Sequence, residues 1–210
     1  MSEEARVREA ICRFAQSIFA RGLTHGSSGN ISARLSDGSL LVTPTGSSFG
    51  TLDPARLARL DPDFRHLDGD RPTKEIPLHS AFYATRSAAT GAVVHLHSTH
   101  SVALSVLPDT DADNVLPPLT AYSVMQLGKV KLLPYFRPGD PAMGDAVRDL
   151  DGTHAAVLLA NHGPVVAGKD LASAVHAMEE LEATAKLALL TRGLNPRLLT
   201  DAQVRALRAD

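Results

Sequence analysis

Residues 1–210 are predicted to form a single α/β domain, and three observations lead to this fold class. Strand-like apolar runs and segments with helical periodicity are mixed along the whole chain. No repeat, linker or low-complexity segment divides it. Hydrophobic residues make up 44% and charged residues 21% of the sequence, which is an ordinary globular composition. A chain of 210 residues buries a sizeable core as one domain.

The N-terminal part is predicted to form a helix followed by a β-hairpin. Val7, Ile11, Phe14 and Ile18 recur at helical spacing on one face, and Gly22 is the expected stop. The two strands of the hairpin are expected around an Asp-Gly turn, with a polar loop on each side. In order, the predicted segments are the loop 26–30, the strand 31–35, the turn 36–38, the strand 40–43 and the loop 44–48.

The remaining elements follow from apolar runs and from residues that begin or end helices. Asp170 is expected to cap a long helix that reaches about Arg192, and Thr200 with Gln203 forms a capping-box pattern. Strands are predicted at 60–67, 92–97, 130–133, 155–160 and 165–167. Further helices are predicted from 72–75 to about 86, after Ser98 or Thr99, and from Pro141.

Composition excludes several classes of function. The formal net charge of −2 provides no overall basic field for nucleic acid or for an anionic membrane. No apolar run is long enough to span a bilayer. Cys12 is the single cysteine, so no intrachain disulfide forms, and it lies in the first helix, where we expect it to pack. Without a secretory signal, a cytoplasmic location is expected.

The triplet His95-Leu96-His97 is the first indication of a metal site. In a strand, alternate side chains point to the same side, so both imidazoles share one face. Two imidazoles at this spacing can bind one zinc ion, at roughly 2.0–2.1 Å from each nitrogen. The alternative is a pair of polar residues on the solvated face of an edge strand, and the triplet alone does not decide between the two.

His162 favours the metal interpretation. It follows a fully apolar strand, and the neighbouring Gly163 permits a close approach of the backbone. Alone, His162 would be interpreted as a turn residue bonded to the backbone. With His95 and His97 it completes a set of three ligands, which with an open position is the pattern of catalytic zinc.

Glu75 is the candidate acid/base residue. It stands at the start of a predicted helix, where the helix dipole also favours a carboxylate, so an ordinary helix-start glutamate is the alternative. His79 lies one turn later, and His100 follows His97 by three residues. Either could be a ligand or a partner of one, but both are ranked below the main set, as packing or surface histidines.

Three stretches of small polar residues could bind a phosphate: Gly29-Asn30, Thr45-Gly46 with Ser47 and Ser48, and Thr73-Lys74. Such loops expose backbone N–H groups to an anion, although the same residues also form ordinary turns. The sequence contains no P-loop and no Gly-x-Gly-x-x-Gly after a strand, so a nucleotide cofactor is not indicated. Without a Gly-x-Ser-x-Gly motif, a covalent hydrolase is disfavoured as well.

Together these motifs resemble the class II aldolase/adducin family, in the family's order and over nearly the whole chain. The matching motifs are Gly26-Ser27-Ser28-Gly29-Asn30-Ile31-Ser32, Thr43-Pro44-Thr45-Gly46, Glu75, Val94-His95-Leu96-His97 and Asn161-His162-Gly163-Pro164. Within the family, the sequence is similar to members that decarboxylate 3-oxo-tetronate 4-phosphate. This second resemblance covers residues 43–50, Lys74-Glu75, 95–100, 135–140, 158–166 and 179–182.

The resemblance implies an α/β/α fold in three layers around a central, largely antiparallel sheet. It implies zinc, or another divalent metal such as manganese or cobalt, on His95, His97 and His162, with Glu75 as the catalytic acid/base. It also implies a homotetramer in which Tyr122 contributes to a neighbouring subunit's site. His100 stays a candidate partner of the metal ligands because it follows His97 by three residues. The implied phosphate contacts are Asn30, Thr45, Gly46, Thr73 and Lys74.

The function implied by the resemblance is sugar-acid catabolism by a carbon–carbon lyase. The reaction is decarboxylation of 3-oxo-tetronate 4-phosphate to dihydroxyacetone phosphate through a metal-stabilised enediolate. A fuculose-phosphate type of aldolase uses the same enediolate and is the alternative. These aldolases typically carry two serines where this chain has Thr73 and Lys74. A non-catalytic, adducin-like interaction module is a third hypothesis, which the complete set of three histidines and Glu75 disfavours.

Overall fold

A central sheet of eight strands organises the protein. The computed structural model describes residues 1–86 and 90–208. The strand order is β4-β3-β2-β1-β5-β8-β7-β6, and within the described residues only the β6–β7 pair is parallel. The largely antiparallel sheet that the resemblance implies is therefore confirmed. The strands are β1 Asn30–Arg34, β2 Leu40–Val42, β3 Ala58–Leu60, β4 His66–Asp68, β5 Ala92–His95, β6 Lys131–Leu133, β7 Ala156–Leu159 and β8 Gly163–Gly168.

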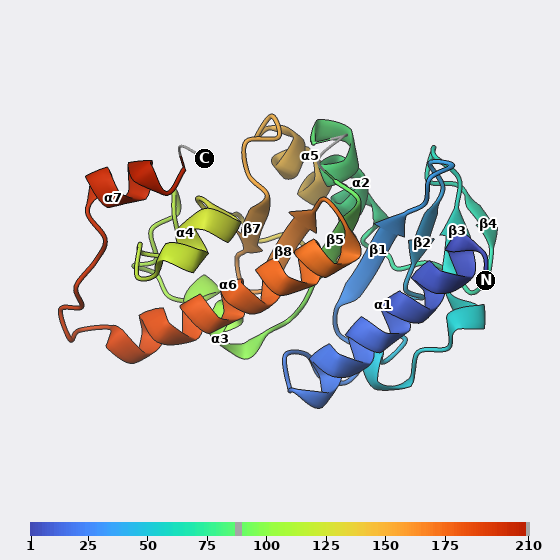
Figure 1. The fold of residues 1–210 in the computed structure, drawn as a ribbon, viewed down its shortest axis with the longest axis horizontal. Helices are drawn as coiled ribbons and strands as arrows, with labels where there is room; N and C mark the ends of the chain where they lie inside the picture. Colours follow the sequence, from blue (N-terminus) through green and yellow to red (C-terminus); the bar gives the residue numbers. More distant parts are fainter. Residues whose placement is uncertain (87–89, 209–210) are drawn as a thin grey trace.

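Helices cover both faces of the sheet, which gives the predicted three layers. The long helices α1 and α6 lie side by side across one face, and α2 and α5 lie behind the sheet (Figure 1). Each face has its own cluster of buried apolar side chains. The helices are α1 Glu3–Ala20, α2 Ile76–Thr85, α3 Thr99–Ser105, α4 Ala121–Leu127, α5 Ala142–Arg148, α6 Leu171–Thr191 and α7 Asp201–Ala206, with 3₁₀ turns η1 Phe49–Thr51 and η2 Pro54–Arg56.

The helix ends follow the capping residues in the sequence. The side chain of Asp170 accepts a hydrogen bond from the Ser173 backbone N–H at the start of α6, as predicted. Thr200 and Gln203 bond reciprocally in the predicted capping box of α7. Among the described residues, no helix combines the length and apolar character needed to cross a membrane.

The centre of the sheet brings distant motifs to one end of three adjacent strands. Asn30, the first residue of β1, pairs with His95, the last residue of β5, and His95 also pairs with Val165 of β8. The turn before β8 approaches β5 so closely that a Cβ on Gly163 would lie 2.2 Å from the Leu96 carbonyl oxygen. Glycine is required there because no side chain fits. The same register places His162, just before β8, next to His95.

Two predicted elements differ from the structure, and one helix is absent from the prediction. Residues 60–67 are not one strand: β3 and β4 pair as a hairpin, with Phe64 at a φ of 64° in the turn between them. The strand predicted at 92–97 ends at His95, although the backbone N–H of Leu96 still bonds to the Pro164 carbonyl. Helix α4 was not predicted; its N-cap is Thr120, whose side chain accepts from the Ser123 N–H.

Cys12 packs as expected. It is half-buried on α1 and contacts the apolar cluster between α1 and the sheet. Burial, reinforced by the charge of Asp53 and opposed by Arg8, raises the pKa of the Cys12 thiol to about 11. At neutral pH the side chain is therefore a thiol rather than the nucleophilic thiolate, which agrees with a packing role.

Candidate functional site

Three histidine side chains converge at the end of the central strands. His95 ends β5, His97 lies two residues further on, and His162 sits in the turn before β8. Nε2 of His95 lies 3.1 Å from Nε2 of His97 and 3.3 Å from Nε2 of His162. The candidate ligand atoms of all three residues lie within 4.8 Å of one another. The structure thus brings together the three histidines that the sequence singled out as metal ligands.

The arrangement fits a divalent cation held by imidazole nitrogens. Nδ1 of His95 lies 2.8 Å from the Pro164 carbonyl oxygen, which can only accept, so Nδ1 carries the proton and Nε2 keeps its lone pair. In a tetrahedral site with nitrogens at ~2.0–2.1 Å from zinc, two nitrogens lie about 3.3–3.4 Å apart. The two measured Nε2–Nε2 separations are close to that value. The donor set therefore suits zinc and the other divalent metals that imidazole binds.

Electrostatics keep two of these imidazoles neutral, the state that metal binding requires. Burial, together with the neighbouring His95, lowers the pKa of His97 to about 3, and Glu75 opposes this shift only in part. The same causes lower the pKa of His162 to about 4. Nδ1 of His162 is buried, and no described residue forms a hydrogen bond with it.

Glu75 lies beside the three histidines, as predicted. It is the N-cap residue of α2, and its Oε2 is 3.3 Å from His95 Nε2 while its Oε1 is 3.3 Å from His162 Nε2. Burial by itself would raise the pKa of Glu75. His95, the hydrogen bond from Asn30 and then His162 outweigh that effect, so the pKa falls below its usual range. The resting carboxylate is therefore ionised and aimed at the histidine cluster.

A line of buried polar side chains extends from Glu75 into the layer between the sheet and α2. Asn30 Nδ2 donates to Glu75 Oε2 at 2.8 Å, and Asn30 Oδ1 lies 2.5 Å from His79 Nε2. His79 Nδ1 is 2.7 Å from Ser32 Oγ, which is 2.9 Å from the Tyr83 hydroxyl. Sequence reasoning ranked His79 low and did not single out Ser32 or Tyr83. The sequence carried only a weak indication of this line. Asn30 and Ser32 alternate on β1, and His79 and Tyr83 are one helical turn apart on α2, so each pair shares a face.

The remaining predicted phosphate contacts lie on two loops that the fold places side by side. An isolated bridge joins Pro44 to Pro72, and the Thr45 N–H bonds to the Arg71 carbonyl at 2.9 Å. Thr45 and Gly46 line a surface hollow of about 350 Å³. Thr73 is buried, and its Oγ1 accepts from the Glu75 N–H, whereas Lys74 is exposed. Asn30 differs from these residues, since both of its polar atoms already have protein partners.

His100 and Tyr122 have contrasting surroundings. His100 is in the first turn of α3, and its Nδ1 is 2.7 Å from Glu182 Oε1. Glu182, a buried carboxylate of α6, also accepts from the backbone N–H groups of His100 and Ser101 at 2.9 Å each and from the Ser101 hydroxyl at 2.6 Å. This carboxylate satisfies the open donors at the start of α3, just beyond His97. Tyr122 lies on α4 with 67% of its surface exposed.

Glu182→Ala is expected to lower the free energy of unfolding by about 2–3 kcal/mol, because it leaves buried donors of α3 without an acceptor. Urea denaturation would measure the loss. Glu179→Ala, on the same helix, is the matched control: it removes a partly exposed ion pair with Arg21, which is worth about 0–1 kcal/mol. Equal losses in the two variants would contradict a special role for Glu182.

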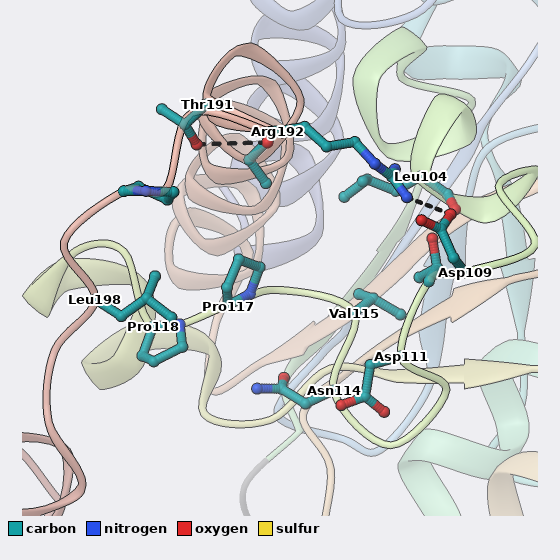
Figure 2. A pocket seen from close by; sticks show the side chains of 14 residues that line it. Leu104, Asp109, Asp111, Asn114, Val115, Pro117, Pro118, Thr191, Arg192 and Leu198 are labelled. Atoms are coloured by element: carbon teal, nitrogen blue, oxygen red, sulfur yellow. Dashed lines mark hydrogen bonds and ion pairs between the residues drawn. The ribbon is translucent and has the colours of Figure 1, made fainter.

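A separate hollow of about 430 Å³ lies between the end of α6, the segment before α4 and the C-terminal tail. Figure 2 shows its mixed lining, with the ion pair between Asp109 and Arg192 on one side and Pro118 and Leu198 on the other. None of the described residues that line this hollow is among the predicted site residues. The chemistry-bearing residues are therefore concentrated at the strand ends and not in this hollow.

Comparisons with known proteins show which family the chain belongs to. The family model for the Class II Aldolase and Adducin N-terminal domain matches residues 9–189. The 3-oxo-tetronate 4-phosphate decarboxylase of Escherichia coli strain K12 is 48% identical over 98% of this chain and 97% of its own. The L-fuculose phosphate aldolase of the same strain is 32% identical over 87% and 83%. The solved structure of YgbL from Escherichia coli covers 99% of this chain and 100% of its own, with a TM-score of 0.96 and 46% identity.

Proposed function

We propose that this chain, which belongs to the class II aldolase and adducin family, is a divalent-metal-dependent lyase that decarboxylates 3-oxo-tetronate 4-phosphate to dihydroxyacetone phosphate. The observation that carries the proposal is the convergence of His95, His97 and His162 beside Glu75 in one largely buried cluster. Relatives at 44–49% identity are named for this reaction, whereas the fuculose-phosphate aldolases are 32–33% identical. We also infer that residues 1–210 act as a single catalytic domain.

His95, His97 and His162 would hold the metal, and we propose zinc because imidazole nitrogens suit it. When bound, a divalent cation supplies Lewis acidity that offsets the negative charge left when a carbon–carbon bond breaks. Each histidine would contribute the lone pair of a neutral imidazole nitrogen. The bond from His95 Nδ1 to the Pro164 carbonyl fixes the tautomer of that ligand.

Glu75 would deliver the proton that replaces the lost carboxylate. Decarboxylation leaves an electron pair on the carbon next to the ketone, and the product requires one proton at that carbon. The substrate's own carboxylate, bound beside Glu75, places a second negative charge near the first, which raises the proton affinity of Glu75. Glu75 can therefore take up a proton when substrate binds and transfer it after carbon dioxide leaves.

The phosphate end of the substrate would lie along the loops that carry Thr45, Gly46, Thr73 and Lys74. Their adjacency through the Pro44–Pro72 bridge supports this assignment, as does the open surface at Gly46 and the exposed ammonium of Lys74. Binding energy from the phosphate would hold the reacting carbon near Glu75. Asn30 remains a predicted phosphate contact through the second N–H of its amide group.

We further propose a cytoplasmic homotetramer in sugar-acid catabolism. The exposed Tyr122 on α4, with Met125 also exposed one turn later, supports a contact between subunits there. In such an assembly Tyr122 would enter a neighbouring site, while His100, held by Glu182, stays close to the ligands of its own chain.

The test is an assay of one metal-loaded preparation with two substrates. We expect release of carbon dioxide from 3-oxo-tetronate 4-phosphate and little aldehyde from L-fuculose 1-phosphate. Aldehyde release without decarboxylation would replace the proposal by the aldolase function, which the 32% identical relatives favour as second candidate. Protein that carries no stoichiometric metal after exposure to zinc or manganese would support the non-catalytic module instead.

A further inference from the structure

The buried line from Glu75 to Tyr83 has a defined hydrogen-bond direction, which follows from what each atom can donate. An ionised carboxylate only accepts, so Asn30 must turn its NH₂ group toward Glu75 and its carbonyl oxygen toward His79. His79 Nε2 must then carry the proton. In a neutral ring Nδ1 accepts, so Ser32 donates to it, and the Tyr83 hydroxyl donates to Ser32.

The surroundings favour this single arrangement. Asn30, Ser32, His79 and Tyr83 are all buried, so water does not compete for their hydrogen bonds. Complete burial, with a contribution from His95 and against the effect of Glu75, lowers the pKa of His79 to about 3, so its ring is neutral at physiological pH. Tyr83, whose ring is covered by the guanidinium of Arg34 at 4.5 Å, is buried as well.

We propose that His79, Ser32 and Tyr83 are positioning residues that hold the Asn30 amide in the one orientation that donates to Glu75. The inference rests on the proposed acid/base role of Glu75. If the hydrogen bonds from Ser32 and Tyr83 were removed, the proton of His79 could move to Nδ1, and the Asn30 amide could then rotate. The Asn30 oxygen would then face the Glu75 carboxylate, two acceptors would repel each other, and the carboxylate would lose its aim at the reacting carbon.

The test compares two serine-to-alanine variants in the zinc-loaded protein. Ser32→Ala removes the donor to His79 and is expected to lower kcat about 10-fold, with KM and bound zinc little changed, as is typical for loss of a supporting partner. Ser39→Ala is the matched control, because Ser39 is also buried but its hydroxyl bonds to Asp37 and Arg59 and not to the residues between Glu75 and Tyr83. Tyr83→Phe, one bond further from Glu75, is expected to have a smaller effect than Ser32→Ala.

A second readout is independent of catalysis. ¹⁵N NMR of the His79 ring, identified by its absence in His79→Gln, is expected to show one Nε2-protonated tautomer in the unchanged protein and a mixture in Ser32→Ala. If Ser32→Ala does not fold, Ser32→Cys keeps a weak donor and should give an intermediate kcat and a detectable second tautomer.

Two results would overturn the proposal: an unchanged tautomer in the Ser32 variants, or a kcat no lower than that of Ser39→Ala. These outcomes are distinct from failure of the proposed function. If the unchanged protein decarboxylates nothing, or if Glu75→Gln retains full turnover, the function fails, while the NMR measurement still tests the chain of hydrogen bonds without any substrate.

Discussion

Glu75→Gln is expected to lower kcat by ~10²–10⁴-fold while the protein still binds one divalent ion per chain. Glutamine has nearly the same shape, and its oxygen can still accept from Asn30 Nδ2. It cannot carry a proton to carbon, however, so turnover falls. The three imidazole ligands remain, so metal content, measured by atomic absorption, should stay close to that of the unchanged protein.

The matched control for this variant is Glu179→Gln, which neutralises a carboxylate on α6 that is paired with Arg21 and lies outside the histidine cluster. Its kcat should be unchanged. Full activity of Glu75→Gln would refute proton transfer by Glu75. Loss of metal in parallel with activity would instead make this carboxylate a structural ligand, an outcome that its 3.3 Å separation from His95 Nε2 makes worth measuring.

His97→Ala should lose metal and activity together. Loss of a residue that hydrogen-bonds to a metal ligand typically lowers metal affinity ~10–100-fold, and loss of a ligand itself should lower it more. His97 is the best of the three for this test, because it is only half-buried and lies beyond the end of β5, whereas His95 is fully buried in the sheet. Truncating His97 therefore damages the core least, and the loss can be attributed to the metal.

Metal affinity is measured by titration with a chelating indicator, and folding is checked by circular dichroism. His66→Ala provides the histidine control, since His66 is exposed on the edge strand β4 and bonds to the Asp68 carbonyl. A His97→Ala protein that retains metal at the affinity of the unchanged chain would remove His97 from the ligand set.

The residues of the histidine cluster and Glu75 were predictable because each stands in a short, local motif. His95 and His97 share a face through simple alternation, and His162 follows an apolar strand directly. The helix ends at Asp170 and Thr200 were predictable for the same reason, since capping acts over three residues.

What sequence reasoning missed depends on contacts between distant segments. The line from Asn30 to Tyr83 exists only because α2 lies against β1, so that side chains from the two elements alternate along it. No local pattern gives the placement of α2 against β1. The turn that interrupts the predicted strand 60–67 does have a local sequence signal, Asp61-Pro62-Asp63. In the structure, Asp61 accepts hydrogen bonds from the N–H groups of Asp63 and Arg65 in that turn. Helix α4 has only seven residues, which is too short to show a clear helical period of apolar residues.

The placement of the histidines in different parts of the chain gives a bound ion a mechanical role. His95 and His162 are 67 residues apart in sequence, and a cation shared by them would close that loop as a reversible cross-link. In a protein with a single cysteine, such a cross-link ties β5 to the turn before β8 in the folded state, and unfolding would have to release the ion. Heat tolerance and catalysis would then depend on the same ion, so scarcity of the metal would shorten the protein's lifetime as well as stop its turnover.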